Sequence, residues 1–258
     1  MEHMAHTWNW TYIALSYIIA AFAAYMSLEL ASRAGKTIET SRNFWLVAQG
    51  FFLGYGIWSM HFVGMLAFEM PTSVSYDTPL TVVSGLVAVV FLIAAIFVMN
   101  GGKMSARRLL TAGAISGAGI VLMHYVGMAA MHVSAARTYS FVPLALSVLI
   151  AVSASCVALF LFSQVTGKWA LDRGRNVLFG LKVVAGLVMG IAIVGMHYTG
   201  MAAVQFAPSA DAALATFGGA DTSLLGLVVL IITFMLMGLA VVMLLMDSGA
   251  QEALESFD

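Results

Sequence analysis

Seven apolar runs, each long enough to cross a lipid bilayer, constrain this chain more than any other feature. A membrane-spanning helix needs about 20 consecutive, mostly apolar residues. The sequence therefore predicts an all-α membrane protein, a bundle of seven transmembrane helices. The predicted spans are Trp10–Ala31, Phe44–Glu69, Thr81–Met99, Leu109–Met131, Phe141–Phe162, Val177–Val204 and Leu224–Met246.

The composition agrees with a membrane protein and argues against a soluble domain. Of the 258 residues, 62% are hydrophobic and only 9% are charged, far from the shares of an average soluble chain. Nothing in this balance suggests a nucleic-acid partner. Cys156 is the only cysteine, which excludes an intramolecular disulfide. No Lys or Arg precedes the first apolar run, so we interpret that run as a span and not as a cleaved signal peptide.

The basic residues predict the orientation of the bundle in the membrane. Ten of the eleven lie in the connections between spans one and two, three and four, or five and six, or close beside them, and Arg137 is the single exception. By the positive-inside rule these connections face the cytoplasm. We therefore expect an outer N-terminus and a cytoplasmic C-terminus. The ten residues are Arg33, Lys36, Arg42, Lys103, Arg107, Arg108, Lys168, Arg173, Arg175 and Lys182.

A short motif occurs three times, near the outer end of each even-numbered span. Its copies are Met60–Met65, Met123–Met128 and Met196–Met201, and a histidine is the second residue of each. Two glycines precede each histidine by eleven and seven residues: Gly50 and Gly54, Gly113 and Gly117, Gly186 and Gly190. Eight residues after the histidines stand Glu69, His132 and Gln205. The chain thus consists of two-helix repeats.

These repeats predict the domain organisation and the packing of the bundle. We expect repeats at about 10–70, 80–132 and 141–205, a seventh span at 224–246, all within one domain over 1–246, and a short cytoplasmic tail at 247–258. The glycines and the histidine fall on one helical face, since each residue turns the helix by about 100°. Glycines spaced by four let membrane helices approach closely. We expect spans two, four and six to touch along these glycines, with the odd spans outside.

The three histidines are candidate metal ligands. A histidine in a membrane helix is often only a structural hydrogen-bonding group, but three in one register favour a shared site. The methionine four residues later lies on the same face, so the expected ligands are His61, His124, His197, Met65, Met128 and Met201. Imidazole with thioether sulfur favours copper, including Cu(I), over zinc. Reserve ligands or supporting residues are Met60, Met123, Met196, Tyr125, Tyr198, Glu69 and His132.

The chain resembles the MHYT domain, a seven-span sensory domain of bacterial membranes named for its tetrapeptide. Only the third copy spells the name, at Met196-His197-Tyr198-Thr199; the first has Phe62 and Val63, and the second has Val126. The resemblance covers nearly the whole chain. It implies the bacterial inner membrane, a copper site near the outer face that senses oxygen, carbon monoxide or nitric oxide, and cytoplasmic domains of cyclic di-GMP turnover in many relatives.

Other functions stay open at this stage. The chain ends about a dozen residues after its last span, so we expect a sensory or binding domain without its own catalytic output. A membrane redox protein or a haem or copper oxidase is one alternative, because paired histidines can hold haem. A copper-binding or transport protein is another, although the histidines share one depth. A retinal receptor is excluded because the last span has no lysine. A homodimer is a candidate assembly.

Overall fold

The computed structural model describes residues 6–35, 39–165, 167, 174–207 and 219–255. It contains seven helices long and apolar enough to cross a membrane within these residues, which confirms the predicted fold class. The helices are α1 (Trp10–Ala34), α2 (Glu39–Leu66), α3 (Thr78–Asn100), α4 (Ala106–Ala130), α5 (Phe141–Val165), α7 (Arg175–Ala203) and α9 (Thr222–Glu255).

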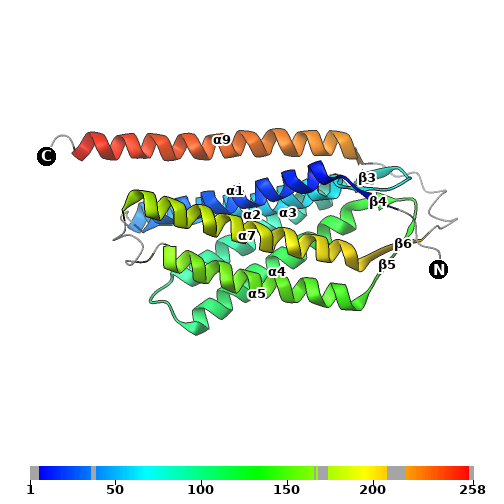
Figure 1. Ribbon diagram of the computed structural model, residues 1–258, viewed down its shortest axis with the longest axis horizontal. Coiled ribbons are helices and arrows are strands. Elements are labelled where there is room, and N and C mark those ends of the chain that lie inside the picture. The colour runs from blue at the N-terminus through cyan, green and yellow to red at the C-terminus, as the bar shows by residue number, and fades with distance from the viewer. Residues whose placement is uncertain (1–5, 36–38, 166, 168–173, 208–218, 256–258) are drawn as a thin grey trace.

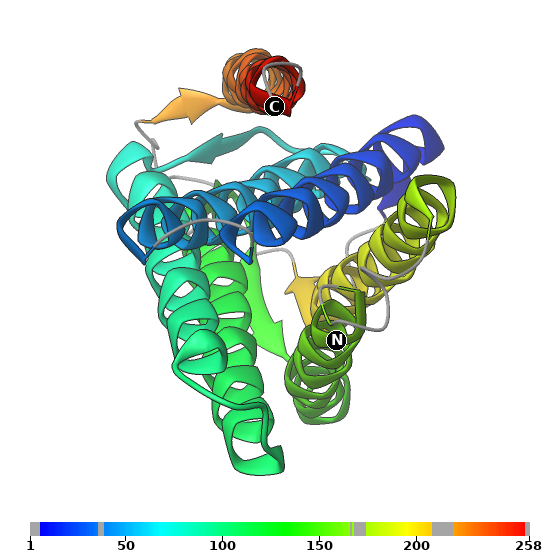
Figure 2. The ribbon, with the colours of Figure 1, turned by 90° about the vertical axis from the view of Figure 1, so that its left-hand side faces the viewer.

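Six of the helices form a closed ring, and α9 lies outside it. Around the ring, contacts join α1 to α2, α2 to α3, α3 to α4, α4 to α5, α5 to α7, and α7 back to α1. Seen end-on, three pairs of helices make the three sides of a triangle, with α9 beyond one side (Figure 2). Helix α9 packs mainly on α2 and continues as helix to Glu255, through most of the stretch expected to be a tail.

Short strands, which the apolar pattern did not predict, gather at one end of the bundle (Figure 1). Each repeat begins and ends with a strand, and its two strands pair antiparallel, so that a repeat runs strand–helix–helix–strand. The pairs are β1 (Thr7–Trp8) with β2 (Phe68–Glu69), β3 (Val74–Tyr76) with β4 (Met131–Val133), and β5 (Ala136–Tyr139) with β6 (Val204–Ala207). A further strand, β7 (Ala220–Asp221), pairs with β3.

Several helices begin at a polar cap directly after a strand. Asn9 accepts a hydrogen bond from the Thr11 amide at the start of α1, and Asp77 accepts one from Leu80 at the start of α3. Asp221 caps α9 in the same way. Such side chains satisfy amides that have no partner within the helix. The second predicted span ended too late: the chain leaves α2 at Leu66, and Phe68–Glu69 is already a strand.

The prediction that the even spans touch along their glycines is wrong. A Cβ on Gly54 would lie 2.7 Å from the Cα of Val89 in α3, and one on Gly117 would lie 2.7 Å from the Cα of Val152 in α5. Gly190 approaches the Cα of Ala21 in α1 equally closely, at 2.9 Å. Gly50, Gly113 and Gly186 make the same three pairings. The glycines do support close helix packing, but they join α2 to α3, α4 to α5 and α7 to α1.

The two ends of the bundle differ in charge. The end with the strands, which we call the histidine end, contains His61, His124 and His197 and one cation, Arg137, whose guanidinium donates to the Met128 carbonyl near the end of α4. The opposite end, which we call the basic end, holds the other described cations. Lys36, Lys168 and Arg173 belong to the same predicted group and lie outside the described residues.

Candidate metal centre

The three histidines meet in the interior, between α2, α4 and α7. They are 0%, 1% and 1% exposed for His61, His124 and His197. Their ring centroids lie 5.0, 5.0 and 5.3 Å apart, and the rings stand nearly perpendicular to one another. The Nδ1 atom of His61 lies 3.1 Å from Nδ1 of His197 and 3.2 Å from Nδ1 of His124. One nitrogen of each ring thus points to a common centre.

The glycine three residues after each histidine makes this convergence possible. A Cβ on Gly127 would lie 2.5 Å from Nε2 of His61, and a Cβ on Gly64 would lie 2.5 Å from Nε2 of His197. Gly200 has the same relation to His124. Each imidazole therefore packs against a glycine of another helix. The contacts form a closed cycle, from α2 to α4, from α4 to α7 and from α7 back to α2. These glycines recur in register in the sequence, but the sequence alone did not indicate that each one faces an imidazole.

The hydrogen bonding of the three rings is incomplete within the protein. All three Nε2 atoms are buried and have no hydrogen-bond partner among the described residues. A neutral imidazole has one N–H and one lone pair. Protons on Nε2 of all three rings leave three Nδ1 lone pairs facing one another. A proton on one Nδ1 allows an Nδ1–H···Nδ1 hydrogen bond between two rings, but the buried Nε2 atoms still lack partners. Either arrangement is costly in an apolar interior, whereas a central cation would accept all three lone pairs.

The cluster is large enough and close enough to hold a metal ion. One ligand atom from each of the three histidines can be chosen so that all lie within 4.8 Å of one another. Among the described residues, this is the group of His, Cys, Asp and Glu side chains with that property. The six motif methionines are all buried and belong to the hydrophobic cluster that surrounds the histidines: Met60, Met65, Met123, Met128, Met196 and Met201.

Comparison with known proteins places this repeated motif in a family. A family described as a bacterial signalling protein N-terminal repeat, MHYT, matches three times, at residues 54–112, 117–173 and 190–253. The chain belongs to the MHYT family. Each matched repeat starts within α2, α4 or α7 and continues into the next helix along the chain, which is α3, α5 or α9. In the folded MHYT ring, α1 occupies the place beside α7 instead.

Two of the three relatives reported are named as enzymes of cyclic di-GMP, and the third is named as a signaling protein. The chain is 38% identical to the bifunctional diguanylate cyclase/cyclic di-GMP phosphodiesterase MucR of Pseudomonas aeruginosa, over 94% of this chain and 34% of MucR. It is 36% identical to the cyclic di-GMP phosphodiesterase NbdA of the same organism, over 85% and 27%. It is 37% identical to the signaling protein YkoW of Bacillus subtilis, over 78% and 24%.

The MHYT chain thus spans about a third or less of the length of these relatives. No solved structure matches it.

The tyrosines of the MHYT motif bind neighbouring helices through their hydroxyl groups. Tyr198 lies 3.1 Å from the Ser16 hydroxyl in α1, and Tyr125 lies 2.8 Å from the Ser147 hydroxyl in α5. The first copy has Phe62, which has no hydroxyl, and the corresponding serine of α3, Ser84, accepts from the Trp58 indole instead. This pattern gives Tyr125 and Tyr198 a part in joining α4 to α5 and α7 to α1; their expected role beside the metal stays a prediction.

The polar residues eight positions after the histidines lie in the strands, outside the histidine group. Glu69 is exposed in β2 and accepts hydrogen bonds from Thr7 and Asn9. His132 lies in β4 opposite Ser75, and Gln205 in β6 donates to Ser140. The structure therefore does not bring Glu69 or His132 together with the three histidines as candidate ligands.

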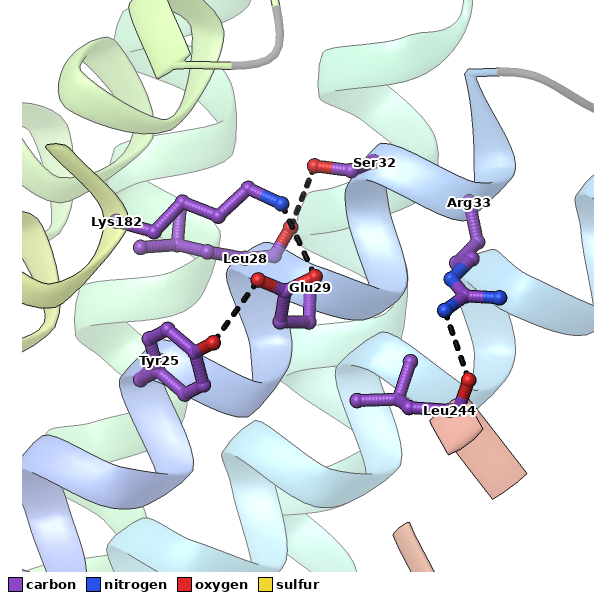
Figure 3. A network of polar contacts seen from close by, with 7 residues as sticks. All are labelled: Tyr25, Leu28, Glu29, Ser32, Arg33, Lys182 and Leu244. Atoms are coloured by element: carbon purple, nitrogen blue, oxygen red, sulfur yellow. Dashed lines mark hydrogen bonds and ion pairs between the residues drawn. The ribbon is translucent and has the colours of Figure 1, made fainter. Parts of the chain in front are cut away.

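A second polar network lies at the basic end of the MHYT bundle and was not predicted as a unit. Lys182 of α7 forms an ion pair of 3.0 Å with Glu29 of α1, and their side chains are only 6% and 20% exposed. Tyr25 donates to the other carboxylate oxygen of Glu29. One turn further along α1, Arg33 donates to the Leu244 carbonyl of α9 at 2.9 Å (Figure 3). Helix α1 therefore links α7 and α9 at this end.

Proposed function

We propose that His61, His124 and His197 hold a copper ion and that this MHYT domain uses it to sense a diatomic gas or the redox state. The observation that carries the proposal is the convergence of three buried Nδ1 atoms whose rings have no complete set of hydrogen bonds within the protein. A cation at the centre would accept the three Nδ1 lone pairs and so remove their mutual repulsion. Each Nε2 would then keep its proton, directed toward Gly127, Gly200 or Gly64.

The distances between the histidines fit a metal ion closely. Three nitrogens at about 2.0–2.1 Å from one ion stand roughly 3.3–3.6 Å apart. The observed Nδ1 separations of 3.1 and 3.2 Å need to widen by only a few tenths of an ångström. Met65, Met128 and Met201 are buried one helical turn beyond the histidines, and thioether ligands from them would favour a soft ion such as Cu(I). Three histidines with a water also form a zinc site, so the preference for copper rests on the thioethers.

Copper at this position would supply an ion that can bind a small gas or change its oxidation state. For signalling, the protein must transmit a change at the histidine cluster to another part of the chain. Ser59 lies two residues before His61 and forms a hydrogen bond with Thr233 of α9; both side chains are fully or almost fully buried. A shift of α2 at the cluster would therefore reach α9, which is the last described helix of the chain.

The receiver of this signal is proposed from the relatives. MucR and NbdA are named for the synthesis or degradation of cyclic di-GMP, and the part of each that aligns with this chain is about a third of its length or less. We infer that the domain regulates cyclic di-GMP turnover or an equivalent output in the cytoplasm. The concentration of cations at the basic end supports a cytoplasmic C-terminus by the positive-inside rule. The histidine cluster would then lie near the outer face of the bacterial inner membrane.

Haem and ion transport fit the geometry less well. The Nδ1 atoms are about 3 Å apart and each imidazole rests on a glycine, so a porphyrin could not enter without moving three helices. A transported ion needs ligands at successive depths, whereas the described residues supply one such group. An absorption spectrum with metal analysis of the purified protein separates these functions. Copper without a Soret band is the expected result, and a Soret band with stoichiometric iron would establish haem and refute the proposal.

A further inference from the structure

A cavity of about 50 Å³ lies inside the helix ring, on the basic side of the histidines. Every ring helix contributes to its wall, and α9 does not. On α2 the lining residues are Gln49, Leu53 and Ile57, which precede His61 by twelve, eight and four positions. At about 1.5 Å per residue, the cavity therefore begins roughly 6 Å from His61 and reaches roughly 18 Å from it.

Two polar atoms at this cavity have no protein partner. Gln49 is 1% exposed and Ser155 is 4% exposed. Neither the Gln49 Oε1 atom nor the Ser155 Oγ atom has a hydrogen-bond partner among the described residues. Two more buried hydroxyls, those of Ser27 and Ser116, belong to side chains that line the same cavity. Four polar side chains from four different helices thus surround one small space in an otherwise apolar interior.

An apolar layer separates this space from the histidines. Ile57, Ile120 and Ile193 each stand one helical turn before a histidine, and all three are buried and line the cavity. The three repeats place the same residue at the same level, so these isoleucines lie between the polar groups of the cavity and the imidazoles. No imidazole lines the cavity, whereas Met196, next to His197, does; the cavity therefore lies beside the metal centre without including its imidazoles.

We propose that this compartment binds an ordered cluster of water molecules, anchored by Gln49 and Ser155. A volume of 50 Å³ has room for about two to four waters, since one water needs at least 10–15 Å³ measured in this way. A buried amide oxygen or hydroxyl without a partner is costly, and buried waters are found where they can make two to four hydrogen bonds. Gln49, Ser155, Ser27 and Ser116 supply that many polar groups.

The chemistry of the lining favours neutral water over an ion. No charged side chain and no histidine lines the cavity, and a cation without such ligands in an apolar interior is strongly disfavoured. An apolar guest would fill the space but would leave the Gln49 and Ser155 oxygens without partners. Water satisfies both requirements, and the Ile57, Ile120 and Ile193 layer keeps it from the imidazoles.

Radiolytic footprinting of the whole protein in lipid nanodiscs tests this proposal. Hydroxyl radicals generated from buried water oxidise methionines beside it to the sulfoxide. Met189 lines the cavity, whereas Met99 does not, and both are 6% exposed. We expect Met189 to be oxidised several-fold faster than Met99. Equal rates for the two methionines would overturn the proposal, because a dry cavity gives Met189 no nearby source of radicals.

Two variants assign the water to its anchors. Gln49→Leu removes the amide and Ser155→Ala removes the hydroxyl, and each should lower the oxidation rate of Met189 toward that of Met99. Ser155→Ala is the milder change and serves if Gln49→Leu does not fold. A Met189 rate that stays at the parental value in the folded variants would contradict anchoring by these groups. The comparison involves no metal, so it is independent of the copper proposal.

Discussion

Replacing Gly200 by alanine is the smallest change that should disturb the histidine cluster. The new Cβ would lie 3.0 Å from both Cδ2 and Cε1 of His124, which is 0.4 Å short of the 3.4 Å at which ordinary contact begins, and closer still to Nε2. The His124 ring cannot simply retreat, because Nδ1 of His61 lies 3.2 Å from its own Nδ1. Overpacking of this kind costs about 1–3 kcal/mol in a rigid interior.

The expected result is a loss of both stability and metal affinity. Displaced supporting contacts typically weaken a metal site by about 10–100-fold. Competition with a copper chelator measures the affinity, and thermal unfolding in detergent measures the stability. Gly195→Ala is the matched control, because it lies on the same helix, five residues away, and its Cβ would have nothing within 4 Å. Equal copper affinity in Gly200→Ala and Gly195→Ala would refute the packing of imidazole on glycine.

Three further predictions concern the bundle. Lys182→Met should destabilise the protein by up to about 3 kcal/mol, because it removes the cation paired with Glu29, whose side chain is 20% exposed, and adding Glu29→Gln should restore most of the loss in thermal melts. Gly117→Leu should cost at least about 2 kcal/mol by forcing α4 from α5, whereas Gly180→Leu, with nothing within 4 Å, should melt like the parent. Copper should dissociate on acidification and rebind as the pH rises, because protons compete for the imidazole lone pairs; occupancy independent of pH would exclude histidine ligation.

The level and direction of the histidines could be predicted from the sequence, because both follow from helical periodicity. A residue that recurs at one place in three equivalent spans must lie at one depth, and His61, His124 and His197 do meet there. The seven helices were predictable for a similar reason, since length and apolarity alone define a span. What periodicity describes is a single helix and its faces.

The partners of those faces could not be predicted in the same way. Gly54 and Gly117 indicate that another backbone comes close, but they do not indicate which one. In the structure these backbones belong to α3 and α5, whereas contacts among α2, α4 and α7 had been expected. The place of α9 shows the same limit, because α1 occupies the ring position that follows α7. The strands were missed because pairs such as Thr7–Trp8 with Phe68–Glu69 join residues about sixty positions apart.

Copper analysis of the purified protein and of a His61→Ala, His124→Ala, His197→Ala triple variant tests the central proposal most directly. Both proteins would be loaded with Cu(I) under the same conditions, freed of excess metal, and compared by metal content per folded chain. We expect about one copper per parent chain, because the described residues form one three-histidine group, and almost none in the triple variant. Copper at the parental ratio in the folded triple variant would contradict the assignment of the metal to these histidines.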